Sequence, residues 1–216
     1  MNEAALRMLG LSTDNQAGVD ELERRIGRRL PAAVREWFGL GADRRLAELT
    51  DNRITDLASL PGEFLTAGLL LLETDSQYCC QLVTTLDEGD NPPVYVVDPD
   101  DFAGETRSRY AETFTTYTEA VVWDALLRGV DEAVWSFDHE IRPGAIENLA
   151  NILTPGPTTF DWAHNQGCDA VYRFHGEARV AVASAGGTAL WTVTSAPDPT
   201  LRTVIAEMLG IPASDR

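Results

Sequence analysis

The chain has 216 residues, of which 44% are hydrophobic, and this is enough for one large domain or two small ones. Its formal net charge is −17, which argues against binding nucleic acid through the phosphates, because such binding needs clustered positive charge. No apolar run approaches the roughly 18 residues of a membrane span, the first residues lack the pattern of a signal peptide, and three cysteines form no disulfide framework. The composition therefore predicts a soluble, cytoplasmic protein with no membrane partner.

Two helices separated by a Leu-Pro corner are predicted near the N-terminus. Apolar residues recur at helical spacing over residues 18–29. Pro31 has its φ angle fixed near the helical value and biases the residue before it away from that region, so a second helix is expected over 31–39. Residues 42–62 are expected to be irregular.

A sheet is predicted in the next part of the chain. Strands are expected over residues 69–73, 77–84 and 94–97, with a short fourth strand near Thr113. Alternation within the second of these strands places Cys79 and Cys80 on opposite faces, where both are interpreted as small buried side chains. A helix capped by Thr116 or Thr118 follows and ends at Gly129.

The remaining residues repeat this arrangement on a smaller scale. A helix opens at Pro143, and a final helix spans residues 200–209. Between them, three β-like runs joined by hairpin turns are expected over 170–175, 179–184 and 188–194. The order predicts an α+β fold: helices and a mainly antiparallel sheet in a domain over residues 1–129, then a helix, hairpin-sheet and helix extension over 130–216.

Four features of the first part of the chain occur together in one order. They are the series Glu23, Gly27, Leu30 and Pro31, the aromatic pair Trp37 and Phe38, the polar turn from Glu73 to Gln77, and the segment Pro92, Pro93, Val94 and Tyr95. This combination, over roughly residues 18–128, resembles the SUKH superfamily (Smi/Knr-type proteins), which includes yeast cell-wall regulators and many bacterial immunity proteins. The resemblance implies a non-catalytic protein-binding module, often one that blocks a toxin such as a nuclease.

The acidic charge is unevenly distributed along the chain. Residues 1–53 contain nine of the 17 basic residues and nine acids, so the rest of the chain carries all of the net charge. Loops that flank a sheet and carry such a surplus suit a basic protein partner. The interaction surface is therefore expected at Glu73, Asp75, Asp87, Glu88, Asp90, Asp98, Asp100 and Asp101. The alternative interpretation is a solvated acidic edge with no partner, which charge taken alone favours.

No catalytic residue, metal or cofactor is expected. His164 and Cys168 are close in sequence, but a thiol and imidazole need spatial contact and an oriented base before they can act as a nucleophile pair. An exposed-aromatic surface at Trp135 with Phe137, or at Trp162, is the other candidate for partner binding, although such residues more often lie in a core.

The predicted function is neutralisation of a basic toxin through an acidic surface. A second hypothesis is an intracellular scaffold or regulator of the same fold that binds a host partner, and a third is a hydrolase that uses His164 and Cys168. The role of residues 130–216 is not assigned by the resemblance.

Overall fold

The computed structural model describes residues 15–128, 133–160 and 168–212. Within these ranges, seven α-helices, one 3₁₀ helix and ten strands form two five-stranded antiparallel sheets, and this confirms the predicted α+β class. The chain separates into two compact units, with the division between Ala125 and Leu126 in the last turn of a helix.

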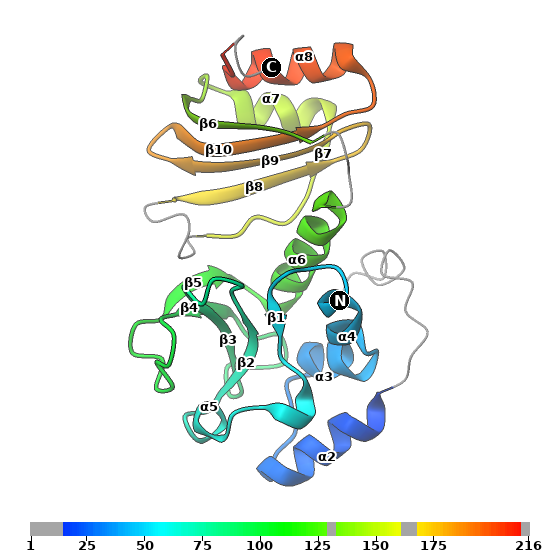
Figure 1. Ribbon diagram of the computed structural model, residues 1–216, viewed down its shortest axis with the longest axis vertical. Helices are drawn as coiled ribbons and strands as arrows, with labels where there is room; N and C mark the ends of the chain where they lie inside the picture. The colour runs from blue at the N-terminus through cyan, green and yellow to red at the C-terminus, as the bar shows by residue number, and fades with distance from the viewer. Residues whose placement is uncertain (1–14, 129–132, 161–167, 213–216) are drawn as a thin grey trace. The chain divides into compact units, whose positions relative to one another are not determined.

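The first unit contains a sheet with helices gathered beside it (Figure 1). Its helices are α2 (Gln16–Ile26), α3 (Ala32–Gly39), α4 (Ala42–Ala47), α5 (Gly62–Thr66) and α6 (Phe114–Arg128), with the 3₁₀ helix η1 (Leu57–Ser59). Its strands are β1 (Arg53–Ile54), β2 (Leu69–Thr74), β3 (Gln81–Thr85), β4 (Val94–Val97) and β5 (Ser108–Ala111). They lie side by side in chain order, each antiparallel to the next.

The Leu-Pro corner is stabilised by a polar side chain, Glu23, which the hydrophobic pattern does not reveal. Gly27 ends α2 with a left-handed φ of 70°, and α3 follows Pro31. The Glu23 carboxylate accepts a hydrogen bond of 2.9 Å from the Leu30 amide and an ion-paired hydrogen bond from Arg35. Burial would raise the pKa of Glu23, but the bonds from Arg35 and Leu30 outweigh it and lower that pKa.

Replacing Glu23 by glutamine is expected to lower the free energy of unfolding by about 1–2 kcal/mol near neutral pH, since a charge-assisted bond across the corner is lost. Because the folded-state pKa is depressed, this contribution is present above the ordinary value of 4.5 and is lost as pH falls through the lower folded value. Urea unfolding at several pH values measures it. The control is Glu21→Gln, which removes an exposed pair with Arg24 and is expected to change stability by less than about 0.5 kcal/mol. Equal effects of the two substitutions would contradict this role of Glu23.

Two sequence expectations for the first unit were wrong. Residues 42–62 contain α4, β1, η1 and the first residue of α5, all too short to produce a recognisable period. The strand expected from residue 77 begins at Gln81, because residues 75–80 form a turn in which Tyr78 has a φ of 58°. As a result Cys79 is exposed, and Cys80 alone of this adjacent pair is buried.

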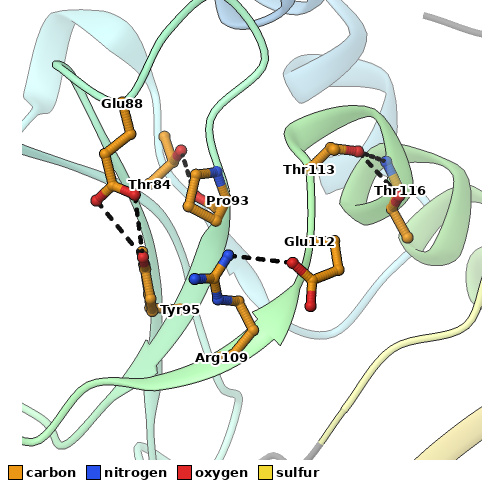
Figure 2. A network of polar contacts seen from close by, with 8 residues as sticks. All are labelled: Thr84, Glu88, Pro93, Tyr95, Arg109, Glu112, Thr113 and Thr116. Carbon is orange, nitrogen blue, oxygen red and sulfur yellow. Dashed lines mark hydrogen bonds and ion pairs between the residues drawn. The ribbon is translucent and has the colours of Figure 1, made fainter.

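The start of α6 also differs from the expected one. The Thr113 hydroxyl accepts a hydrogen bond of 3.1 Å from the Thr116 amide, so Thr113 caps the helix and Thr116 lies inside its first turn (Figure 2). The strand expected near Thr113 is β5, which ends at Ala111.

The second unit is a sheet with two helices on one face. Its elements are β6 (Val134–Glu140), α7 (Ala145–Ile152), β7 (Thr154–Pro155), β8 (Ala170–His175), β9 (Arg179–Ala185), β10 (Thr188–Ser195) and α8 (Pro199–Leu209). The strand order is β6-β10-β9-β8-β7, and α7 and α8 lie together over the sheet (Figure 1). The three predicted strands and the final helix are confirmed, whereas β6 was not predicted.

Candidate functional site

The acidic residues expected to form one interaction surface lie at opposite ends of the first sheet. Because β2 to β5 are consecutive antiparallel neighbours, the β2–β3 turn and the β4–β5 loop share one end, and the β3–β4 loop occupies the other. The first end carries Asp98, Asp100 and Asp101, and the second carries Asp87, Glu88 and Asp90. At about 3.4 Å per residue the strands separate the two ends by about 10 Å or more. The expectation of one continuous surface is corrected accordingly.

Glu73 and Asp75 are not surface residues. They are 5% and 7% exposed. Glu73 lies near the buried Tyr117 of α6, whose pKa is raised well above its ordinary value, first by burial and then by the negative charge of Glu73. Asp75 organises the β2–β3 turn, where its carboxylate accepts hydrogen bonds from the amides of Gln77 at 2.8 Å and Cys79 at 3.5 Å. Both acids are structural, since their side chains are turned away from solvent.

At the end formed by the β3–β4 loop, Glu88 is hydrogen-bonded to Tyr95 of β4 (Figure 2). The Tyr95 hydroxyl of β4 donates to Glu88 at 3.3 Å, and burial followed by the charge of Glu88 raises the pKa of Tyr95. The guanidinium carbons of Arg107 and Arg109 lie 5.2 and 4.9 Å from the centre of the Tyr95 ring. Arg109 also donates to Glu112 at 3.3 Å. The sequence window from 87 to 105 contains no arginine, but the fold brings Arg109 of β5 and Arg107 of the β4–β5 loop over the ring of Tyr95.

The other end of the sheet keeps an exposed acidic surface, and we refer to residues 75–80 and 98–107 together as the acidic loop end. The exposed or partly exposed acids of its longer loop are Asp98, Asp100, Asp101 and Glu105. Tyr78, which is 52% exposed, joins the two loops, since its hydroxyl donates a hydrogen bond of 2.8 Å to Asp100. This bond raises the pKa of Tyr78.

Both partners in this bond have an unusual backbone. Tyr78 and Asp100 have φ angles of 58° and 65°, a left-handed region that residues other than glycine seldom adopt. Such conformations cost on the order of 1–3 kcal/mol each and persist only where the surroundings impose them. Gln81 supplies part of that support, because its side chain accepts from the Asp100 amide at 3.3 Å and donates to Thr74 at 3.3 Å.

The longer loop, residues 98–107, is also held by hydrogen bonds between its own residues. The Asp101 carboxylate accepts two hydrogen bonds of 2.7 Å from Thr106, one from the amide and one from the hydroxyl. These bonds lower the pKa of Asp101, so the charged form of this carboxylate is favoured. Phe102 in the same loop packs edge-on against the buried Phe64 of α5, with ring centres 5.1 Å apart. The acidic loop end is therefore a shaped surface rather than a loose acidic edge.

The side chains considered for catalysis or metal binding do not form a site within the described ranges. Cys168 is buried, and its thiol donates to the Ala170 carbonyl at 3.2 Å, while His164 lies outside the described residues. Across the residues that the structure describes, no group of three or more His, Cys, Asp and Glu side chains is placed to hold a metal ion. None of the described helices has both the length and the apolar character needed to cross a bilayer.

Sequence reasoning missed two features. The first is the strand β6, on which Trp135 and Phe137, the alternative aromatic candidates for partner binding, are 50% and 60% exposed, whereas Trp162 lies outside the described residues. Alternation in the segment AVWSFDHE could have indicated a strand with both rings on one face. The second is Asp43 in α4, a buried carboxylate with no sequence signal.

Comparison with known proteins gives no relative: no family model, curated protein or solved structure matches this chain.

Proposed function

We propose that this protein acts by binding a basic protein partner through the acidic loop end. The observation that carries the proposal is the hydrogen bond between Tyr78 and Asp100, two exposed residues held in left-handed conformations on separate loops. Strain retained at an exposed position is typical of functional surfaces. A half-exposed tyrosine is also among the side chains that contribute most to protein interfaces.

Charge supports the choice of partner. The loop of residues 98–107 contains four acids and one arginine, Arg107, and that guanidinium lies over the ring of Tyr95. Arg53 of β1 is close enough to Tyr78 to lower its pKa slightly against the larger effect of Asp100, so the end is not uniformly negative. The whole chain at −17 steers a basic protein toward it from a distance.

The finer form of the proposal is toxin neutralisation: the acidic loop end covers the basic active surface of a toxin, for example a nuclease, whose substrate is itself an anion. The resemblance of residues 18–128 to the SUKH superfamily supports this form. The alternative is a scaffold or regulator that binds a host protein with the same surface. The experiment below distinguishes this function from toxin neutralisation.

The proposal predicts that the pair of substitutions Asp98→Asn and Asp100→Asn weakens partner binding at least about tenfold, since two charges are lost and the hydrogen bond from Tyr78 loses its charged acceptor. Partners are captured from native lysate at low and moderate salt, identified, and titrated as purified proteins. Tyr78→Asn tests the aromatic side chain separately, because asparagine tolerates the left-handed φ at this position.

The matched control is Asp87→Asn with Asp90→Asn, which removes the same charge from the opposite end of the sheet and is expected to change affinity by less than about threefold. Equal losses from both pairs would mean that only net charge matters, and the assignment to the acidic loop end would be wrong. If the function is toxin neutralisation, expression of the captured protein is expected to arrest growth. Co-expression of the native chain is then expected to restore growth, whereas the Asp98/Asp100 variant is not. A captured protein that is harmless to growth indicates the scaffold function instead.

A further inference from the structure

The second unit has an open sheet edge at β6. In the described part of the chain β6 pairs only with β10, so the outer side of this seven-residue strand carries no neighbour (Figure 1). The strand at the other edge, β7, has two residues, one of them Pro155, and shortness and proline are both usual ways of protecting an edge. The edge at β6 is longer and contains no proline, although Asp138 near its end has a left-handed φ of 50°.

Two stacked aromatic rings stand beside this edge. The rings of Trp135 and Phe137 are 6.3 Å apart and nearly parallel, at 13°, and Trp191 of β10 lies 5.7 Å from Trp135. Ser136, which lies between these two residues, is buried. Because β10 pairs with both β6 and β9, Ser136 is in register with Val182 of β9. Val182 belongs to the hydrophobic core under α7 and α8. Trp135 and Phe137 therefore face the opposite side of the sheet from the helices. Exposed aromatic residues on an open edge are typical of a surface that pairs with another strand.

We propose that β6 pairs in antiparallel orientation with β6 of a second copy of this chain, about a two-fold axis at Ser136. In that register Trp135 of one copy lies beside Phe137 of the other, and the reverse contact is made at the same time. Aromatic pairs across antiparallel strands stabilise the pairing, and the interface is closed because the same residues serve both copies. The two sheets become one ten-stranded sheet.

The charges on β6 permit pairing with a second copy and favour the antiparallel orientation. Residues 133–137 are uncharged, and the acids Asp138 and Glu140 follow at one end of the strand. In the antiparallel register Asp138 lies opposite Val134 of the second copy. The two copies of Asp138 are four residues apart along the strand, or about 13 Å, which exceeds the Debye length of about 8 Å at physiological ionic strength. Parallel pairing would instead place like charges side by side.

The dimer is expected to be reversible, because one strand and its rings form an interface at the small end of the known range. Sedimentation velocity is expected to show dimers at high protein concentration and monomers on dilution. Added salt is expected to strengthen the dimer, since it screens repulsion between two chains that each carry −17. Salt acts in the opposite direction on binding of a basic partner, so the failure of this inference is distinguishable from failure of the proposed function.

Two substitutions test the interface and its register. Phe137→Glu places a charge against the ring of Trp135 in the second copy and is expected to raise the dissociation constant at least about tenfold. Val204→Glu, which adds the same charge at an exposed apolar position on α8, is the control and is expected to leave the dimer unchanged. Trp135→Arg is expected to be monomeric alone but to form a mixed dimer with Phe137→Glu, because the new charges meet across the axis.

Three results would overturn the inference. The first is a wild-type chain that stays monomeric at every concentration. The second is a dimer that Phe137→Glu leaves intact, since self-association would then use another face. The third is a mixture of Trp135→Arg and Phe137→Glu that remains monomeric, because the proposed register would then be wrong.

Discussion

Replacing Asp43 by asparagine is expected to raise the free energy of unfolding by about 2–3 kcal/mol near neutral pH, since one unit of pKa shift corresponds to about 1.4 kcal/mol. Asp43 is 2% exposed, and one carboxylate oxygen has no hydrogen-bond partner among the described residues. Burial raises its pKa to about 6 from an ordinary value of 3.8, against the opposing effect of the Arg44 amide and charge. Asparagine has nearly the same shape but no charge to desolvate.

The pH dependence of this effect has a definite sign. Between 3.8 and about 6 the folded state binds more protons than the unfolded state, so wild-type stability falls as pH rises through this range. The gain from Asp43→Asn is therefore fully present above that window and disappears below it. Urea unfolding at several pH values across this window measures the difference. Asp87→Asn, at an exposed carboxylate, is the control and is expected to show little change at any of them. A gain that does not depend on pH would contradict the raised pKa.

Replacing Gly210 by alanine is expected to lower the free energy of unfolding by about 2–4 kcal/mol, of which a left-handed backbone accounts for about 1–2 and overpacking for the rest. Gly210 ends α8 with a φ of 82°. A Cβ atom there would lie 2.7 Å from the carbonyl oxygen of Glu140 and 3.2 Å from Cγ of Arg142. The carbonyl belongs to the last residue of β6, so it cannot move without disturbing the strand.

The matched control is Gly27→Ala at the end of α2. This glycine has a φ of 70°, but nothing lies within 4 Å of the position that a Cβ atom would take. Only the backbone cost of about 1–2 kcal/mol is expected there. Chemical denaturation of both variants separates the two contributions. Equal losses at the two glycines would show that close packing of α8 against the end of β6 contributes nothing.

Regular elements with a clear period were predictable from the sequence. Apolar spacing in residues 18–29 and the glycine-containing hairpins after His175 and Ala185 produce signals that local chemistry determines, and the structure has α2 and the strands β8 to β10 there. The short elements between residues 42 and 62 were not predictable, because two to six residues define no period and their stability comes from tertiary packing.

The candidate site was predictable only in part. The sequence identified Asp98, Asp100 and Asp101 as acids on loops beside a sheet. It could not show that strand order places Asp87 at the opposite end, because that depends on which strands pair. It also could not show that Tyr78 bonds to Asp100, since this contact joins residues 22 positions apart. Buried Glu73 and Asp75 illustrate the same limit: a charge in the sequence does not reveal whether it faces solvent.

Binding of the partner by the acidic loop end can be tested by hydrogen exchange of the chain with and without the captured basic protein. Amide exchange in residues 75–80 and 98–107 is expected to become slower on binding, with exchange in residues 86–93 unchanged. Protection confined to residues 86–93, or to β6, would contradict the assignment of this surface.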